Sequence, residues 1–176
     1  MLYTVPNFFK NIKGDILFHL EIKKKSKSFS NYIVTFLSIR MMPTLLYRIS
    51  YLFFELHLQP ISKIFSLINF LVFGIEIAIN TKIGSGLFFP HTNGTVIGAK
   101  VIGEKSIIYH NVTIGAKFID TSNDLIARPV IGNNIKIATG SMILGDITIG
   151  NNVIIGPNIV ILKSIDSNNK ILINSC

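Results

Sequence analysis

The stretch IGNNIKIATGSMILGDITIGNNVIIGPNIVI, residues 131–161, decides the fold. An isoleucine recurs in it at every sixth position, and four earlier aliphatic residues keep the same spacing. A period of six fits neither a helix nor a simple strand. It is typical of a three-sided parallel β-helix, in which each flat side takes one hexad and three hexads close a coil. The predicted inward-facing residues are Ile131, Ile137, Ile143, Ile149, Ile155 and Ile161, preceded by Val96, Ile102, Ile108 and Ile114.

The remainder of the chain departs from this repeat. Residues 1–75 carry apolar stretches interrupted by charged residues such as Arg48 at amphipathic spacing, which indicates helices. We expect a mainly β chain, with the β-helix occupying residues 76–166 and a short tail at 167–176. The hexads break at 116–129, which predicts an excursion loop of the kind that often carries binding function.

The positive charge is concentrated in the helical region. The formal net charge is +8, and residues 1–75 contribute nine basic against three acidic residues. The run Lys23–Lys27 is the local peak, which is either a solvated turn or a contact for anionic lipid or an acidic polymer. The apolar segment Ile64–Ile79 is interrupted by polar residues, so we expect it to pack on the β-helix or on a membrane surface rather than to span a membrane. No basic patch with interleaved aromatics indicates nucleic acid.

The expected compartment is the cytoplasm. The single cysteine, Cys176, leaves no disulfide within the chain and favours a reducing environment. Met1–Asp15 has no apolar region followed by a small-residue cleavage site, so no secretory signal is expected. A peripheral location at the inner membrane stays open because of the basic helical region.

His91 lies at the first irregularity of the hexads, because Ile83 and Val96 are thirteen residues apart where twelve would keep phase. One extra residue is expected to bulge there and turn the imidazole outward. A neutral imidazole is suited to act as general base on a hydroxyl, although a lone histidine is more often an ordinary surface residue. Glu76, about one coil below in an otherwise apolar run, is either the carboxylate that orients His91 or a surface acid.

His110 is expected to stack on His91 from the next coil, about 4.8 Å above it by strand spacing. It would bind the acceptor or tune His91, or be a solvated edge residue. His19 and His57 lie in the helical region without a supporting pattern. No paired cysteines, HxxxH spacing or clustered acids predict a metal site, and no phosphate-binding loop is present.

Several runs of the sequence resemble the left-handed β-helix acyltransferases of the serine acetyltransferase type. The matching runs are EIAINTKIGSG at 76–86, FPH at 89–91, VIG at 96–98, VTIG at 112–115, RPVIGNN at 128–134 and ILGDITIG at 143–150. The resemblance extends over residues 76–165. It implies a left-handed coil, a homotrimer with active sites between subunits, and acetyl-CoA as donor without a metal.

The resemblance also implies roles for individual residues. The catalytic histidine of the family falls at His91, and its acidic partner at Glu76, where serine-specific enzymes have aspartate. We expect the acceptor to contact Asn93, His110 and Arg128. Acetyl-CoA would lie along the main chain of the later coils, with a lysine meeting its phosphates and a backbone N–H near the groove stabilising the oxyanion. The residues expected to contact it are Gly115, Ala116, Thr139, Pro157 and Lys163.

Two departures from the family bear on the acceptor. Serine acetyltransferases carry an aspartate immediately before the catalytic histidine, where this chain has Pro90, and a histidine where it has Arg128. A small zwitterion needs a carboxylate for its ammonium group, which Pro90 cannot supply. The short basic helical region and His110 are similar to the polysaccharide O-acetyltransferases of surface-polysaccharide gene clusters, such as colanic-acid-type enzymes.

The sequence therefore predicts an acetyl-CoA-dependent O-acetyltransferase acting on a sugar hydroxyl of a capsular polysaccharide, an exopolysaccharide or an O-antigen. The acceptor would be a monomer, a lipid-linked unit or a polymer, and trimers could associate further through the N-terminal helices. Two alternatives stay open: a serine O-acetyltransferase of cysteine biosynthesis, and a non-catalytic trimeric scaffold.

Overall fold

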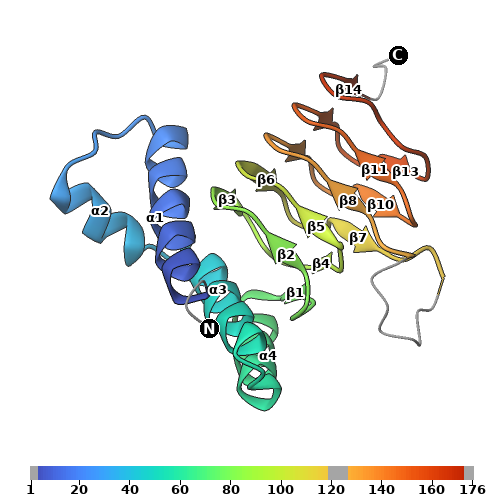
Figure 1. The fold of residues 1–176 in the computed structure, drawn as a ribbon. Coiled ribbons are helices and arrows are strands. Elements are labelled where there is room, and N and C mark those ends of the chain that lie inside the picture. The colour runs from blue at the N-terminus through green and yellow to red at the C-terminus, as the bar shows by residue number, and fades with distance from the viewer. Residues whose placement is uncertain (1–3, 119–126, 173–176) are drawn as a thin grey trace.

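The computed structural model describes residues 4–118 and 127–172. Four helices come first in this part of the chain, and they gather at one end of a stack of short strands (Figure 1). The helices are α1 (Thr4–Ile22), α2 (Phe29–Phe36), α3 (Met42–Glu55) and α4 (Gln59–Phe73). The strands are β1 (Ile75–Ile77), β2 (Lys82–Ile83), β3 (Leu87–Phe88), β4 (Thr95–Ile97), β5 (Val101–Ile102), β6 (Ser106–Ile108), β7 (Thr113–Gly115), β8 (Val130–Ile131), β9 (Lys136–Ile137), β10 (Met142–Leu144), β11 (Thr148–Ile149), β12 (Ile154–Ile155), β13 (Val160–Ile161) and β14 (Lys170–Ile171).

The strands form three parallel sheets, one for each side of a β-helix. Their orders are β1-β4-β7-β10-β13, β11-β8-β5-β2 and β14-β12-β9-β6-β3, so each strand from β4 to β13 lies beside the third one before it, and β14 lies beside β12. Met142 pairs with Val160, and this separation of eighteen residues is three hexads. The predicted β-helix preceded by helices is therefore confirmed. The middle of the expected excursion loop, residues 119–126, lies outside the described residues.

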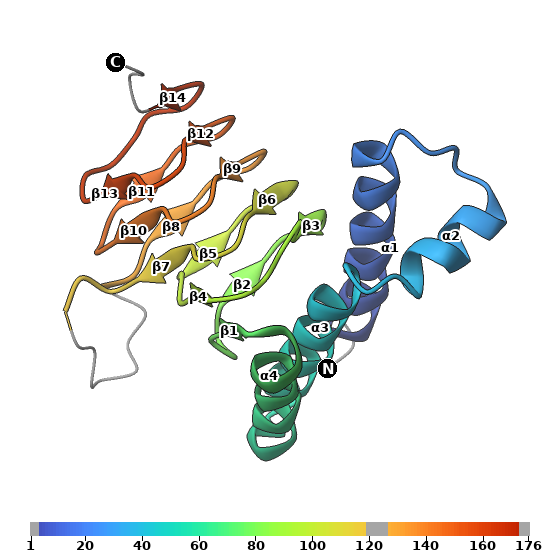
Figure 2. The same ribbon diagram turned by 180° about the vertical axis from the view of Figure 1, so that it is seen from behind.

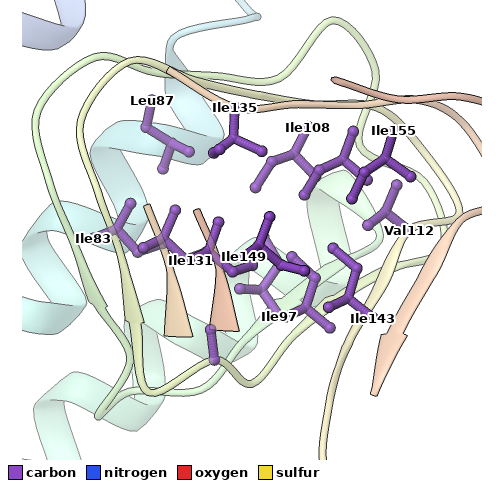
Figure 3. Packing of buried hydrophobic residues seen from close by; sticks show 14 of the residues in the cluster. Ile83, Leu87, Ile97, Ile108, Val112, Ile131, Ile135, Ile143, Ile149 and Ile155 are labelled. Atoms are coloured by element: carbon purple, nitrogen blue, oxygen red, sulfur yellow. The ribbon is translucent and has the colours of Figure 1, made fainter. Parts of the chain in front are cut away.

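The isoleucines of the repeat fill the interior of the coil, where their side chains point toward one another (Figure 3). The six from Ile131 to Ile161 are all buried, as are Ile102, Ile108 and Ile114. A continuous stack of aliphatic side chains replaces a conventional core, and each coil buries its apolar surface against the next.

Val96 is the one predicted inward residue that is not buried. Its side chain is 40% exposed, and Ile97 takes the interior position. Val96 follows Phe88 by eight positions, whereas Thr113 follows Ile107, their strand partners in the next coil, by six. Val101 then follows Val96 by five positions, one fewer than between their partners Glu76 and Lys82 in the first coil. The insertion of two residues and the loss of one leave the single extra residue that the sequence indicated. Between the two changes, however, the register is shifted, so a different side chain faces inward.

Asparagines occupy successive corners of the coil. Asn134 and Asn152 both have φ of 56°, in the left-handed region that asparagine tolerates better than most residues. Asn134 Nδ2 donates to Asn152 Oδ1 at 2.9 Å, and Asn152 Nδ2 donates to Asn168 Oδ1 at 2.8 Å. This ladder of amides satisfies the corner side chains and keeps neighbouring coils in register.

Strand β14 lies within residues 167–176, which the sequence places in a tail. It pairs in parallel with β12, with Lys170 opposite Ile154 and Ile171 opposite Ile155. These partners are sixteen rather than eighteen residues apart, so the last coil is two residues short. Hexad spacing therefore ends at Ile161 although the sheet continues.

Side chains of α3 close the open edge of the first coil. The Tyr47 hydroxyl donates to Thr81 O at 2.8 Å and accepts from Ile83 N at 3.0 Å. Arg48 donates to Ile83 O and to Gly84 O, each at 2.6 Å. A terminal coil would otherwise expose unpaired backbone groups, so these contacts act as the cap that a solenoid needs.

Asp15 of α1 completes this cap. Its carboxylate accepts from Gly86 N at 2.8 Å and from Leu87 N at 2.9 Å, and it pairs with Arg48 at 2.8 Å. Both charged side chains are buried. In this buried ion pair, Arg48 donates to backbone carbonyls at the edge of the first coil, and Asp15 accepts from backbone N–H groups there.

Helix α4 ends directly against the first strand. Gly74 caps it with φ of 62°, and a Cβ at this position would overlap the Asn93 side chain, so glycine is required on both counts. The change of chain direction at Gly74 fixes where β1 begins, and it therefore fixes the position of Glu76 in that strand. Within residues 4–118 and 127–172, no helix is long and apolar enough to cross a membrane.

His19 makes the stability of this helix–coil contact depend on pH. Burial lowers its pKa from 6.5 to about 4, although its Nε2 lies 3.2 Å from Leu87 O, a contact that raises the pKa. In the unfolded chain His19 binds a proton below about pH 6.5, whereas in the folded chain it stays neutral down to about pH 4. The contribution of His19 to the free energy of unfolding is therefore fully present above pH 6.5 and is lost as the pH falls toward 4. Linkage puts the loss at roughly 3 kcal/mol.

Urea unfolding at several pH values between 7 and 4 would measure this loss. We expect His19→Gln, which carries no titrating group, to show a smaller decrease than the unaltered chain over the same range. Equal decreases in the two proteins would show that other groups cause the acid sensitivity.

Candidate active site

His91 lies in the enlarged corner between β3 and β4. The two residues added there lengthen the turn, and the turn is tied to the C-terminal end of α4. Thr92 Oγ1 donates to Phe73 O at 2.7 Å, and Gly94 N donates to Gly74 O at 2.9 Å. The His91 side chain is exposed beyond this anchored turn. The corner thus fixes the backbone and leaves the imidazole accessible.

His110 lies against His91 from the next coil, as the spacing of the two histidines predicts. The ring centroids are 5.7 Å apart and the planes are nearly perpendicular, at 88°. Thr139 Oγ1 lies 2.9 Å from each ring nitrogen of His110 and donates to the His110 carbonyl at 2.9 Å. Thr139, which the resemblance assigns to acetyl-CoA, therefore also restrains His110.

A hollow of about 510 Å³ surrounds the two histidines. Its polar lining comes from Thr92 and Asn93 beside the histidines and from Arg40, which precedes α3. Its apolar walls are Ile39, Pro43, Phe73, Phe89 and Pro90. No carboxylate is among these lining residues, so within the described part of the chain the hollow has basic and neutral groups only.

Glu76 is not part of this hollow. It projects outward from β1, with buried Ile75 and Ile77 on either side, and lines a separate hollow of about 400 Å³. Arg128 lines that second hollow with it, and Arg128 Nη1 also lies beside Gly98. Within one chain, Glu76 and Arg128 therefore line one hollow and His91 and His110 line another, and the two hollows have no lining residue in common.

The residues expected to contact acetyl-CoA lie on successive coils. Space beside Gly115 is open, since a Cβ placed there would meet no atom of the described chain within 4 Å, and Ala116 follows it at the end of β7. Pro157 lies one coil beyond Thr139, because Asn158 N donates to Thr139 O at 2.8 Å. Lys163 is exposed just after β13.

Two features of the site were beyond the reach of sequence patterns. Arg40 lies some fifty residues before His91, and no local motif connects them. Phe73 reaches the hollow because α4 ends beside the enlarged corner. Among the described residues, no group of three or more His, Cys, Asp or Glu side chains could hold a metal ion.

Comparisons with known proteins identify related sequences and folds. Residues 128–163 match the family described as bacterial transferase hexapeptide (six repeats). The serine acetyltransferase of Helicobacter pylori is 35% identical over 106 residues, which are 58% of this chain and 59% of that protein. Across the first curated relatives, the chain spans between 27% and 59% of their length.

Solved structures match over nearly the whole chain. Serine acetyltransferase isoform 3 from Entamoeba histolytica, in complex with cysteine, has a TM-score of 0.78 and 28% identity, and the match covers 96% of this chain and 59% of that one. A serine acetyltransferase in complex with CoA has a TM-score of 0.81 at 22% identity, covering 96% and 68% respectively, and this likeness concerns the fold alone.

These comparisons contradict the polysaccharide reading of the sequence. The relatives and structural neighbours are named serine acetyltransferases, which favours the alternative of serine as acceptor. The prediction gave too much weight to Pro90. Pro90 removes a partner for the ammonium group of serine, but it says nothing about the serine carboxylate, for which Arg40 from outside the repeat offers a cation on the wall of the hollow. The chain thus has a hexapeptide-repeat β-helix that is similar in fold to the β-helix of serine acetyltransferases, and its N-terminal helices share in the structural match.

Proposed function

We propose that this chain is an acetyl-CoA-dependent O-acetyltransferase whose acceptor is the hydroxyl of L-serine or of a closely related small hydroxy acid. The observation that carries the proposal is the His91–His110 pair in an accessible hollow at the enlarged corner. Serine acetyltransferase relatives supply the acceptor class, and the neighbour solved with CoA supports the donor.

The chemistry needs one base and no covalent intermediate on the protein. His91 accepts the proton of the acceptor hydroxyl as its oxygen attacks the thioester carbonyl. The tetrahedral intermediate then collapses to the O-acetyl ester, and the CoA sulfur leaves with the proton returned by the His91 imidazolium. A backbone N–H near Gly115 or Ala116, beside the open space there, would stabilise the oxyanion.

A homotrimer would bring the two separated pairs of residues together. The outward face of the β1 sheet carries exposed apolar side chains at Val96, Met142 and Val160, which suit burial between subunits. Glu76 and Arg128 of one subunit would then face His91 of its neighbour. There Glu76 would orient the imidazole and Arg128 would contact the acceptor, with Asn93 at the rim of the same hollow.

Acetyl-CoA would run along the coils beyond His110. The space at Gly115 that no described residue fills, the stacked Thr139 and Pro157, and the exposed cation of Lys163 suit a pantetheine chain followed by phosphates. Because acetyl-CoA is the donor, the proposal implies a compartment that contains it, in keeping with the cytoplasmic location expected from the sequence.

The test is acetyl-CoA-dependent thiol release by the purified full chain offered L-serine. We expect turnover that requires serine and yields O-acetylserine. Thiol release with other hydroxyl compounds, but none with L-serine or a related small hydroxy acid, would overturn the acceptor. Failure to bind CoA by an intact trimer would overturn the enzymatic proposal and leave the scaffold alternative.

Arg40 is predicted to hold the carboxylate of the acceptor. It is the cation on the wall of the His91 hollow, and a charge-assisted hydrogen bond to a carboxylate is worth about 1.5–3 kcal/mol. We therefore expect Arg40→Gln to raise the KM for L-serine by about tenfold or more while kcat changes little. Steady-state kinetics with serinol, which has the amine and hydroxyls but no carboxylate, provide the comparison.

The KM for serinol should not change in Arg40→Gln, and Lys100→Gln, an exposed cation elsewhere on the coil, should change neither KM. An equal rise for both acceptors would assign Arg40 a structural role. An unchanged KM for L-serine would remove Arg40 from the acceptor site while leaving the proposed activity intact.

A further inference from the structure

Helix α2 presents apolar side chains to solvent and a polar one to the protein. Phe29 is 82% exposed and Leu37, which caps the helix, is 67% exposed, whereas Thr35 is 2% exposed. Ile33, Val34 and Phe36 are exposed as well. Amphipathic helices of water-soluble proteins normally have the opposite arrangement, so this apolar surface is suited to an external partner.

The position of α2 leaves that apolar surface open. Both views show α2 beyond α1, on the side away from the β-helix (Figures 1 and 2). Its inner side rests on α1, where Tyr32 packs against the cluster of Ile16, Leu20 and Met41. The outer side has no covering element among the described residues.

Lysines adjoin this apolar surface without acidic neighbours. Lys24, Lys25 and Lys27 are exposed in the connection from α1 to α2, and residues 22–54 contain no acid. The two acids just before them are engaged elsewhere: Glu21 pairs with Lys105 at 3.1 Å, and Asp15 is buried against Arg48. The charge next to α2 is therefore uncompensated.

We propose that the α2 surface, defined as Phe29, Ile33, Val34, Phe36, Leu37 and the lysines Lys24, Lys25 and Lys27, docks on an anionic lipid bilayer. The apolar side chains would enter the headgroup region, and the lysines would meet lipid phosphates. A second copy of the chain is a poorer occupant, because a symmetric contact would bring the two lysine clusters together. This inference does not depend on the proposed activity.

Flotation of the full chain with vesicles tests the proposal. We expect binding to vesicles of phosphatidylcholine mixed with phosphatidylglycerol, weak binding to phosphatidylcholine alone, and a decrease with added salt. Each lysine at an anionic surface contributes about fivefold to partitioning, so Lys24→Gln/Lys25→Gln/Lys27→Gln should lower the partition coefficient by about 100-fold. Leu37→Ser should lower it by roughly tenfold or more.

Matched controls show whether binding depends on the α2 surface or only on the total positive charge and exposed apolar area of the chain. Lys100→Gln/Lys136→Gln/Lys170→Gln removes three positive charges as well, and Leu172→Ser removes an exposed leucine at the far end of the coil. Neither control should change binding by more than about twofold. Absence of vesicle binding by the unaltered chain, or an equal loss in the controls, would overturn the proposal. So would a reduced oligomeric mass of Leu37→Ser in light scattering without vesicle binding, which would make α2 a contact between copies.

Discussion

Replacing His91 with alanine should lower kcat for acetyl transfer to L-serine by about 10²–10⁴-fold, the usual contribution of a positioned general base. The imidazole is accessible, adjoins His110 at 5.7 Å between ring centroids, and sits on a turn anchored to the C-terminal end of α4. Its loss removes the proton acceptor without touching the buried stack of isoleucines. CoA affinity and the midpoint of thermal unfolding should therefore stay close to those of the unaltered chain.

His57→Asn is the matched control for this measurement. His57 is an exposed histidine between α3 and α4 with φ of 60°, a conformation that asparagine accepts, and it lines neither the His91 hollow nor the Glu76 hollow. It should retain full activity. More than about a hundredth of the original kcat in His91→Ala would show that His91 is not the general base.

A mixture of two variants tests whether Glu76 orients His91 of its own subunit or His91 of a neighbouring subunit. If Glu76 acts across a subunit boundary, His91→Ala and Glu76→Gln trimers are each impaired. Mixed trimers then contain sites with an intact His91 from one variant and an intact Glu76 from the other. Co-refolded or co-expressed mixtures should regain part of the activity. No recovery in trimers shown to be mixed would place both groups in one subunit.

The fold was readable from the sequence because every hexad repeats the same physical requirement. Each repeat needs one inward aliphatic side chain and a corner that accepts unusual backbone angles, so Ile131 to Ile161 could be assigned without knowing any neighbour. Val96 was misassigned because the inserted and missing residues around it cancel almost completely along the chain. Only the pairing of strands shows that Ile97 faces inward.

The site was only partly readable for a similar reason. His91 and His110 are related by one coil, so counting residues could place them together. Arg40 reaches the same hollow from the helices, and no periodic relation connects a helix to a coil. Glu76 differs from the histidines, since its position along the coil is clear from the sequence, but it lines a different hollow from His91 within one chain.

Charged residues in the helices were the hardest to interpret. At amphipathic spacing, Arg48 suggests a solvated helix face, yet the structure buries it against Asp15 at the first coil. The two residues are 33 positions apart, and their common target is backbone that has no pattern of its own. Sequence indicates that a solenoid end needs a cap, but not which side chains provide it.

Asp15→Ala should destabilise the chain by about 3–5 kcal/mol, the usual cost of leaving one partner of a buried ion pair uncompensated. The change strands the buried Arg48 guanidinium and removes the acceptor for two backbone N–H groups, at Gly86 and Leu87. Typical domains have only about 5–15 kcal/mol of stability, so the variant should unfold at markedly lower urea concentration. Equilibrium urea unfolding near pH 7.5, where His19 is neutral in both states, measures the difference.

The exposed pair of Glu21 and Lys105 provides the control within the same helix–coil contact. Their side chains are more than half exposed, and such pairs contribute about 0–1 kcal/mol, so Glu21→Ala should be nearly neutral. Replacing both Asp15 and Arg48, by alanine and leucine, should cost less than the sum of the two single changes, because no charge is left buried alone. Additive losses, or an Asp15→Ala effect as small as that of Glu21→Ala, would mean that the helices are held to the coil by their apolar contacts and that the buried pair does not cap it.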